Sequence, residues 1–331
     1  MNVTLQKMRE LIMISLLLPN INYGIITFVG TMLAFAATCF LLHKAKDFLP
    51  QDQGREYAHD GKLSAGKPRG AGFVFILVFA AAYLLFGRLD IERLIYIVLV
   101  IACMLTGYLD DCAKSPWGEY KKGLLDLMLA VMMAVTYINF NGTQLSIPSI
   151  GFEMQLHPLL YGFLIVVLVW ASINVTNCAD GVDGLSGTLT IITLATIYFM
   201  IEMQGGDADF SYAILVFIVC ILGYLWYNAT PSRMLMGDAG SRAMGIFIAM
   251  AILKTENPIM YIPVAFVLIM DGGLGLVKVA LLRFLKIRIF ANTRLPLHDH
   301  VRKNLGWSNT QTVFRFSIIQ LIISIAVLYA L

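Results

Sequence analysis

The chain has 331 residues, of which 59% are hydrophobic and 14% are charged. A soluble domain carries about 25% charged residues, so this composition excludes an ordinary soluble protein and predicts an all-α polytopic membrane protein. The net charge of +3 is small, so its placement matters more than its size, and we expect no nucleic-acid partner.

Ten apolar segments are candidates for membrane-spanning helices, each of which needs about 20 residues. They cover residues 24–43, 71–87, 91–109, 123–140, 158–174, 185–202, 210–227, 239–253, 259–285 and 312–331. The segment 239–253 is short for a span. We find no internal repeat and no sign of a separate soluble domain, so residues 1–331 are expected to form one integral membrane unit. The five cysteines show no paired spacing and predict neither disulfides nor a zinc site.

Lysine and arginine residues concentrate in the odd-numbered connections between these segments. The first connection carries Lys44, Lys46, Arg55, Lys62, Lys67 and Arg69, and the ninth carries Arg283, Lys286, Arg288, Arg294, Arg302 and Lys303. The even-numbered connections hold only Arg88, Arg93 and Lys254. Because cytoplasmic loops are enriched in these residues, the odd connections are expected to be cytoplasmic and both termini extracytoplasmic. Alternating polarity near 145–156 predicts a small external β-hairpin.

With this topology, four polar stretches fall on the cytoplasmic side. They are Asp110-Asp111, the stretch 174–187 (NVTNCADGVDGLSG), the run 236–241 (MGDAGS) with Asn228 before it, and 296–300 (PLHDH). In the second stretch, Asp180 and Asp183 are three residues apart and would share one face of a helical turn. Any single stretch is also explained by helix caps, because Asp and Asn are good N-caps. Four stretches on one side indicate an assembled site.

Acidic residues that converge at a membrane edge, with lysines nearby, suit a magnesium-bound phosphate substrate. Mg²⁺ is often held by one or two carboxylates together with substrate phosphates, and it helps a phosphate leaving group depart. Adjacent carboxylates such as Asp110 and Asp111 repel each other, which favours a cation or a phosphate-rich ligand nearby.

The basic residues of these loops have two explanations. Lys62, Lys114, Lys121 and Lys122 could hold phosphates or anionic lipid headgroups, whereas loop cations most often only set the topology. Asp271 lies inside the ninth segment, and its role stays open between a helix-packing contact and a partner of a site residue.

The four motifs together, in this order and on one side, resemble the polyprenyl-phosphate N-acetylhexosamine-1-phosphate transferases. Within that superfamily, the motif at 296–300 resembles the Pro-x-His-His-His of members that transfer phospho-N-acetylmuramoyl-pentapeptide, while sister enzymes tend to carry Arg-x-His-x-His-His. The resemblance covers most of the chain. It implies ten helices with both termini outside, a place in the bacterial inner membrane and an active site on the cytoplasmic face, and it leaves a homodimer open.

The resemblance also implies a reaction and a set of site residues. Undecaprenyl phosphate would attack the β-phosphate of UDP-N-acetylmuramoyl-pentapeptide and release UMP, giving the first lipid intermediate of peptidoglycan synthesis. Asp238 would bind the Mg²⁺ cofactor, Asp110 and Asp111 would lie near the lipid phosphate with one of them as the base, and His298 would complete the catalytic set. The substrate-binding positions implied are Lys62, Lys122, Asn174, Asn177, Asp180, Asp183, Gly184, Asn228, Leu235 and His300.

Three departures from the family pattern concern nucleotide binding. Residues 67–72 read Lys-Pro-Arg-Gly-Ala-Gly where the family has Thr-Pro-Thr-Met-Gly-Gly, Asp299 replaces the middle histidine, and Leu235 replaces a phenylalanine that would stack on the base. Transfer of N-acetylglucosamine-1-phosphate stays open as an alternative. An ion-coupled transporter is the alternative from another class, because intramembrane acids often mark proton relays. Against it, the acids lie at one interface and no inverted repeat is visible.

Overall fold

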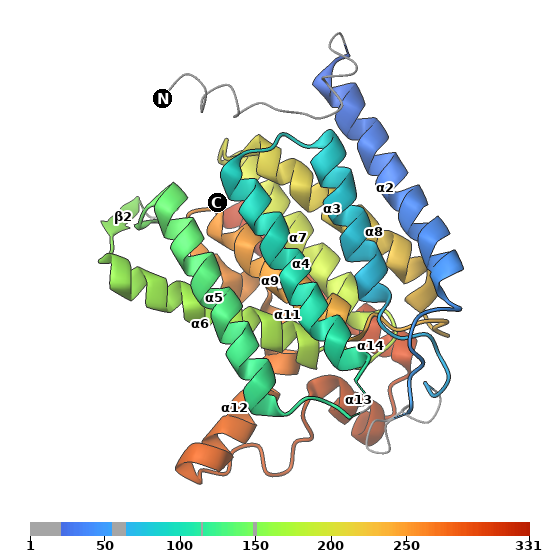
Figure 1. Cartoon of the computed structure of the whole chain (residues 1–331). Helices are drawn as coiled ribbons and strands as arrows, with labels where there is room; N and C mark the ends of the chain where they lie inside the picture. The colour runs from blue at the N-terminus through green and yellow to red at the C-terminus, as the bar shows by residue number, and fades with distance from the viewer. Residues whose placement is uncertain (1–20, 55–63, 114, 148–150) are drawn as a thin grey trace.

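Apolar helices make up most of the structure, a computed structural model that describes residues 21–54, 64–113, 115–147 and 151–331. Their arrangement is drawn in Figure 1. The long helices are α2 (Tyr23–Ala45), α3 (Ala71–Phe86), α4 (Ile91–Asp111), α5 (Glu119–Asn141), α6 (Pro158–Cys178), α7 (Leu185–Met203), α8 (Ala208–Asn228), α9 (Gly237–Leu253) and α14 (Asn309–Ala330). They run up and down one bundle, as expected for apolar segments joined by short loops.

The prediction of a multi-span membrane protein is confirmed. In the described part of the chain, seven helices are long and apolar enough to cross a membrane, namely α2, α4, α5, α6, α7, α8 and α14. An eighth span is formed if the bent pair 258–264 and 266–285 counts as one. Helices α3 and α9, which coincide with two further apolar segments, are shorter, at 16 and 17 residues. Every predicted segment therefore falls on helical structure.

The short helix α9 lies at the centre of the bundle (Figure 1), and all of its residues are buried. It packs against α3, α4, α6 and α7. Two glycines allow the closest crossings, because a Cβ atom at Gly72 of α3 would overlap the backbone of Gly240, and one at Gly107 of α4 would overlap the backbone of Asp238. Small residues let helix backbones approach in this way. These crossings bring the start of α9 beside the end of α4 and the start of α3.

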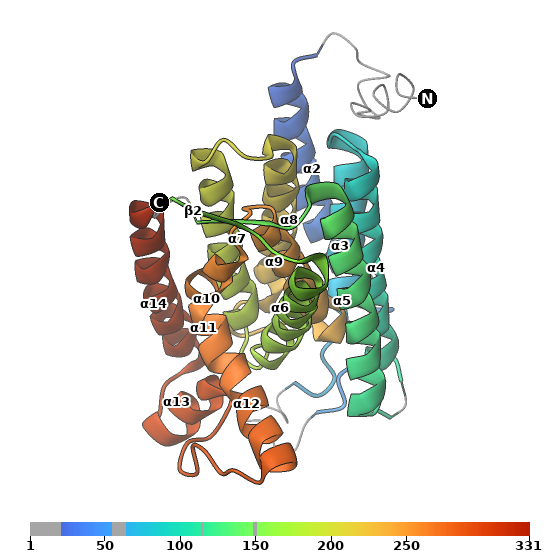
Figure 2. The same cartoon turned by 90° about the vertical axis from the view of Figure 1, so that its left-hand side faces the viewer.

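The ninth segment, residues 259–285, was expected to be a single helix, and this expectation is wrong. It consists of η4 (Pro258–Met260), α10 (Tyr261–Val264), α11 (Phe266–Leu268), the π-helical η5 (Ile269–Gly273), α12 (Leu274–Ala280) and the π-helical η6 (Leu281–Leu285). The two parts meet at 73°. Pro263 lacks an N–H and crowds the preceding turn, and Ala265 leaves the helical region with φ −113° and ψ 21°. Figure 2 shows α12 leaving the bundle at the end where α13 lies.

The predicted hairpin is present. Strands β1 (Gln144–Ile147) and β2 (Phe152–Gln155) pair antiparallel, with Leu145 opposite Met154. The Ser146 N–H donates to the Glu256 carbonyl at 3.1 Å, which ties the hairpin to the end of α9. In Figure 2 the start of α2 and the end of α14 lie toward this end of the bundle.

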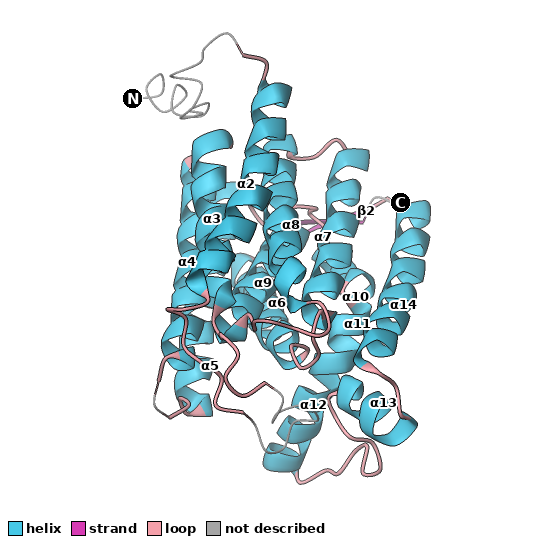
Figure 3. Ribbon diagram, turned by 90° about the vertical axis from the view of Figure 1, so that its right-hand side faces the viewer, coloured by secondary structure: helices cyan, strands magenta, loops and turns pink. Residues whose placement is uncertain are grey.

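The opposite end, which we call the site end, carries the connections 46–54, 64–70 and 229–236, the α6–α7 loop and the helix α13 (Leu297–Leu305). Figure 3 shows these connections in the lower half of the molecule, near α12 and α13. Helix α13 was not predicted, because its residues fall in the connection between the ninth and tenth apolar segments. It begins after Pro296 and ends at Gly306, whose φ of 69° is the left-handed conformation that favours glycine.

Candidate active site

The carboxylates of Asp110, Asp111 and Asp238 meet at the site end. Asp110 and Asp111 are the last residues of α4, and Asp238 lies in the first turn of α9. The close crossing at Gly107 places the two helix ends together. The Ala239 N–H donates to Asp111 Oδ2 at 3.1 Å, so the amino end of α9 supports one of the carboxylates directly.

Arg69, from the loop before α3, contacts three carboxylates. Its Nε donates to Asp111 Oδ1 at 2.8 Å, Nη1 to Asp52 Oδ2 at 3.1 Å and Nη2 to Asp238 Oδ1 at 3.3 Å. Burial lowers the pKa of Arg69, but Asp111 and Asp238 outweigh it, and the pKa lies above its ordinary value. The guanidinium therefore stays charged and orders the cluster.

Lys122, in the first turn of α5, is the second cation of the cluster. Its Nζ forms an ion pair with Asp110 and lies 3.1 Å from Asp238 Oδ2. The Trp117 N–H donates to the other oxygen of Asp110 at 2.7 Å. Each carboxylate thus has a hydrogen-bond or ion-pair partner. The two cations lie between the carboxylates and offset the repulsion among their negative charges.

A pocket of about 140 Å³ opens beside this cluster. Six predicted site residues line it, namely Asn177, Asp180, Asp183, Asn228, Leu235 and Asp238, together with Asp52, Arg69 and Arg302. The prediction that Asp180 and Asp183 share a helical turn is wrong, because both lie in the loop between α6 and α7. Asn177, which was assigned to that loop, lies in the last turn of α6. Asn228, assigned to the next cytoplasmic connection, is the last residue of α8.

Several of these polar residues also hold the loops in place. Asn228 accepts from the Gly184 N–H at 2.8 Å and donates to the Met234 carbonyl at 2.9 Å. Asp183 accepts from the Ser232 N–H at 3.2 Å. The α6–α7 loop and the 229–236 connection are therefore fixed against each other around the pocket.

His298 and Asp271 form a buried pair. The His298 backbone N–H donates to Asp271 Oδ1 at 2.7 Å, and Nδ1 of the ring lies 2.8 Å from Asp271 Oδ2. A Cβ atom at Gly181 would overlap the His298 ring at Nε2. The alternative left open for Asp271 is thereby decided, because it is the partner of a predicted site residue. Because Gly181 has no side chain, there is room for the His298 ring, and α13 packs directly against the α6–α7 loop.

The remaining predicted residues lie apart from the pocket or outside the described structure. Asn174, in α6, donates to Asp126 Oδ2 at 3.3 Å and to the Trp170 carbonyl at 2.9 Å. His300 accepts from the Arg294 N–H at 3.4 Å on the other side of α13. Lys62 lies outside the described residues.

Comparison with known proteins places this arrangement in a family. The sequence model of glycosyl transferase family 4 matches residues 93–256, which contain all three clustered aspartates. A phospho-N-acetylmuramoyl-pentapeptide-transferase from Treponema pallidum (strain Nichols) is 39% identical over 327 residues, covering 93% of this chain and 90% of the relative. The chain belongs to the phospho-N-acetylmuramoyl-pentapeptide-transferase family.

More distant members of the phospho-N-acetylmuramoyl-pentapeptide-transferase family also match over most of their length. One from Clostridium botulinum (strain Alaska E43 / Type E3) is 29% identical, with 86% of this chain and 88% of the relative covered. One from Campylobacter jejuni (strain RM1221) is 26% identical, with 91% and 94% covered. The family therefore accounts for most of the length of the chain.

Four residues near the site were not predicted. Arg69 and Arg302 were counted only as topology-setting cations, and Asp52 was not considered. Arg69 occupies a position where this chain departs from the family pattern, and that departure was the available signal. Arg242, one helical turn after Asp238, forms a buried ion pair with Asp126. It had no signal beyond being a charge within an apolar segment.

The clustered carboxylates are suited to binding one kind of metal ion. In the described ranges, no group of three or more His, Cys, Asp or Glu side chains is arranged as a metal site. Asp110 and Asp238 nevertheless converge on one cation, Lys122 Nζ, with hard oxygen donors from two helices. This donor set suits Mg²⁺, which is commonly held by one or two carboxylates while substrate phosphates complete its shell.

Proposed function

We propose that the chain transfers phospho-N-acetylmuramoyl-pentapeptide from its UDP derivative to undecaprenyl phosphate, releasing UMP and forming the first lipid intermediate of peptidoglycan synthesis. The observation that carries the proposal is the family membership, at 39% identity over 93% of the chain. The meeting of Asp110, Asp111 and Asp238 with Arg69 and Lys122 supports it, because phosphoryl transfer needs positioned charge more than covalent help.

In this reaction an oxygen of the lipid phosphate attacks the β-phosphorus of the UDP-sugar. The bond from the β-phosphorus to the bridging oxygen breaks, and UMP leaves with that oxygen. Asp110 or Asp111 accepts the proton of the lipid phosphate, since a carboxylate within reach can act as a general base. Arg69 and Lys122 exchange part of their contact with the carboxylates for contact with phosphate oxygens, which a guanidinium binds through two parallel hydrogen bonds.

Asp238 would hold Mg²⁺, which when bound neutralises charge on the pyrophosphate and stabilises the departing UMP. Asn177, Asp180 and Asp183 line the pocket in which the nucleotide is proposed to bind. Asp271 fixes the His298 ring through Nδ1, so that Nε2 is held over the α6–α7 loop. His298 thereby keeps this loop, and the nucleotide on it, in place during transfer.

The proposed setting is a bacterial inner membrane, with ten spans, both termini outside and the site end in the cytoplasm. Helices α3 and α9 are included as spans because a buried helix of 17 residues extends about 26 Å, close to the roughly 30 Å of a hydrocarbon core. The position of the α2 start and the α14 end away from the site supports this orientation (Figure 2).

Turnover by the purified protein with two donors tests the proposal. Release of UMP would be measured with undecaprenyl phosphate and either UDP-N-acetylmuramoyl-pentapeptide or UDP-N-acetylglucosamine. We expect turnover of the pentapeptide donor and little turnover of the smaller one. The opposite preference would assign transfer of N-acetylglucosamine-1-phosphate, and no UMP release with either donor would refute the reaction class.

A further inference from the structure

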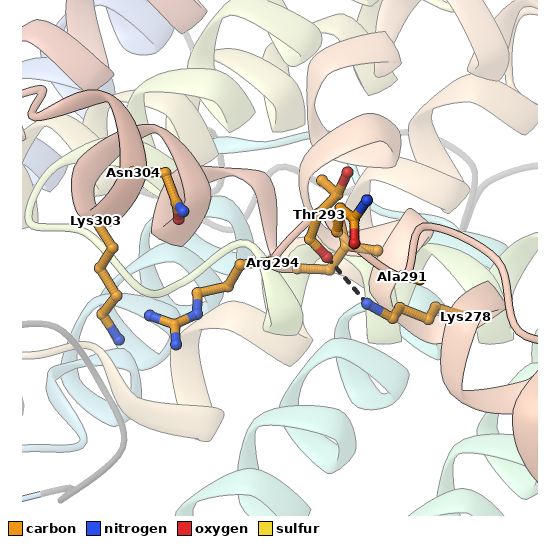
Figure 4. Close-up of a pocket in the computed structure, with 8 residues that line it drawn as sticks. Lys278, Ala291, Thr293, Arg294, Lys303 and Asn304 are labelled. Carbon is orange, nitrogen blue, oxygen red and sulfur yellow. Dashed lines mark hydrogen bonds between the residues drawn. The ribbon is translucent and has the colours of Figure 1, made fainter.

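A second and larger cavity lies at the site end, on the outer side of α13. This basic cleft has a volume of about 520 Å³ and is lined by Lys278, Ala291, Asn292, Thr293, Arg294, Leu295, Lys303 and Asn304. Figure 4 shows the Arg294 and Lys303 side chains reaching toward the same part of it. Its lining contains three cations, two amides and no carboxylate. Such a set of donors is suited to an anionic ligand.

The cleft is built by specific contacts. Lys278 of α12 donates from Nζ to the Phe290 and Thr293 carbonyls, each at 2.9 Å, and so holds the connection between α12 and α13 in place. One of these bonds is drawn in Figure 4. Arg294 donates its backbone N–H to His300 of α13 at 3.4 Å. Lys303 lines the cleft and forms an ion pair with Asp299 of the same helix, with Nζ 3.8 Å from Oδ2.

Helix α13 is the common wall of the cleft and the catalytic pocket. Arg302 faces the pocket and donates to the Gly181 carbonyl at 3.2 Å, while the next two residues, Lys303 and Asn304, face the cleft. The pocket holds about 140 Å³, whereas sites for drug-sized ligands hold roughly 300–1,000 Å³. A nucleotide sugar bearing a peptide therefore extends beyond the pocket.

The peptide is long enough to reach the cleft. Five extended residues span about 17 Å, and a helix with its side chains is about 10–12 Å wide. A pentapeptide attached to a sugar at the pocket can thus pass α13 and place its terminal carboxylate on the far side.

We propose that the basic cleft binds carboxylates of the substrate's pentapeptide, with Arg294 and Lys303 as the principal contacts and Lys278 as the residue that shapes the cleft. This inference rests on the proposed function. It makes the cleft a specificity-determining subsite, because a donor without the peptide gains nothing from it. Discrimination between the two UDP-sugars then arises outside the nucleotide pocket.

The test compares a double variant, Arg294→Gln with Lys303→Gln, with the wild-type protein in nanodiscs of phosphatidylcholine. The matched control is Lys286→Gln with Arg288→Gln, which removes two exposed cations of the same connection that do not line the cleft. Affinity is measured as KM for the pentapeptide donor, and as Ki against that donor for UDP-N-acetylmuramic acid without the peptide. A third ligand is the pentapeptide donor with its peptide carboxylates amidated.

Each pair between partly exposed charges contributes a factor of about two to five, so the double variant should raise KM for the pentapeptide donor by about fivefold to twentyfold. Its Ki for the peptide-free donor should equal that of wild type. Amidation should weaken binding to wild type by a similar factor and have no further effect in the double variant, since the two changes remove the same contacts. The control variant should match wild type with every ligand.

An unchanged KM for the pentapeptide donor would overturn the inference, and so would an equal loss of affinity for the donors with and without the peptide. The measurements are repeated with phosphatidylglycerol in the nanodiscs. The double variant could instead lose affinity only in the nanodiscs with this anionic lipid, and equally for both donors. That result would assign the cleft to a lipid headgroup and also overturn the inference. If wild type did not turn over the pentapeptide donor at all, the proposed function itself would fail.

Discussion

Arg69 and Asp111 form an ion pair in which Nε and Oδ1 are 2.8 Å apart, and the Asp111 side chain has no exposed surface. The same guanidinium reaches Asp52 and Asp238. One side chain from the loop before α3 thus holds carboxylates from three parts of the chain. This links one of the departures from the family pattern to the centre of the proposed chemistry.

Replacing Arg69 by lysine should therefore lower activity strongly. Lysine keeps one positive charge but lacks the planar fork that contacts three carboxylates at once. We expect kcat/KM for UMP release to fall by about tenfold to a hundredfold. Arg233→Lys, at an exposed position of the 229–236 connection, is the matched control and should behave as wild type. Normal turnover by the Arg69 variant, with an unchanged melting temperature, would remove Arg69 from the site.

Asp271 and His298 should act as one unit. His298→Ala is expected to lower kcat/KM by at least about tenfold, or about 1.4 kcal/mol of transition-state stabilisation. Asp271→Asn keeps the shape but changes the hydrogen bond to Nδ1, so it should produce a loss of similar size. Because both variants disturb the same ring, the double variant should be no worse than His298→Ala alone. Additive losses in these kinetics would show that Asp271 acts independently of the histidine.

At the hairpin end, Asp207 predicts a pH-dependent contribution to stability. It caps α8 and accepts from Arg93 Nη2 at 2.7 and 2.9 Å. Burial raises the pKa of Asp207, but Arg93 outweighs it, and the pKa lies below its ordinary value. A carboxyl with a lowered pKa stabilises the fold above its unfolded pKa, about 3.9, and this contribution is lost as the pH falls through the folded value.

Asp207→Asn should accordingly lower the melting temperature at pH 7 by roughly 2–4 °C. The difference from wild type should shrink as the pH falls below about 4. Thermal unfolding in detergent over this pH range measures both effects. A difference that stays constant down to the lowest pH would mean that the charge of Asp207 is not what stabilises α8.

The orientation in the membrane can be tested by cysteine labelling. In a background without the native cysteines, Glu153→Cys in β2 should react with an impermeant thiol reagent added outside intact cells. Ala65→Cys, in the loop before α3, should react only after the cells are opened. Both positions are exposed, so access and not burial decides the result. The reverse pattern would overturn the proposed orientation and with it a cytoplasmic site.

The sequence predicts the bundle well because apolar run length is a direct physical requirement of a membrane span. It failed where local backbone chemistry interrupts a run. Pro263 and the non-helical backbone of Ala265 break the ninth segment, although its hydrophobicity is continuous. The sequence does contain a pattern that predicts α13. Leu297, Val301 and Leu305 repeat every four residues and Gly306 follows, which is the pattern of a short amphipathic helix with a glycine stop.

The site was predicted more completely for its acids and amides than for its cations. Asp and Asn residues near apolar segments are rare enough to stand out, and those at 177, 180, 183, 228 and 238 all line one pocket. Lysines and arginines are common in cytoplasmic loops for reasons of topology, so composition does not separate Arg69 or Arg302 from their neighbours. Only the tertiary crossing of α3 and α9 brings Arg69 to Asp238.

Identification of the lipid product tests the central claim most directly. Purified wild-type protein, given UDP-N-acetylmuramoyl-pentapeptide, undecaprenyl phosphate and Mg²⁺, should form undecaprenyl-pyrophosphoryl-N-acetylmuramoyl-pentapeptide, as identified by mass spectrometry, together with an equal amount of UMP. Asp238→Asn, which keeps the shape but removes the charge proposed to hold the metal, should form less than about a hundredth as much at every magnesium concentration while remaining folded. Absence of this lipid from the wild-type reaction, or near-normal formation by the Asp238 variant, would contradict the account.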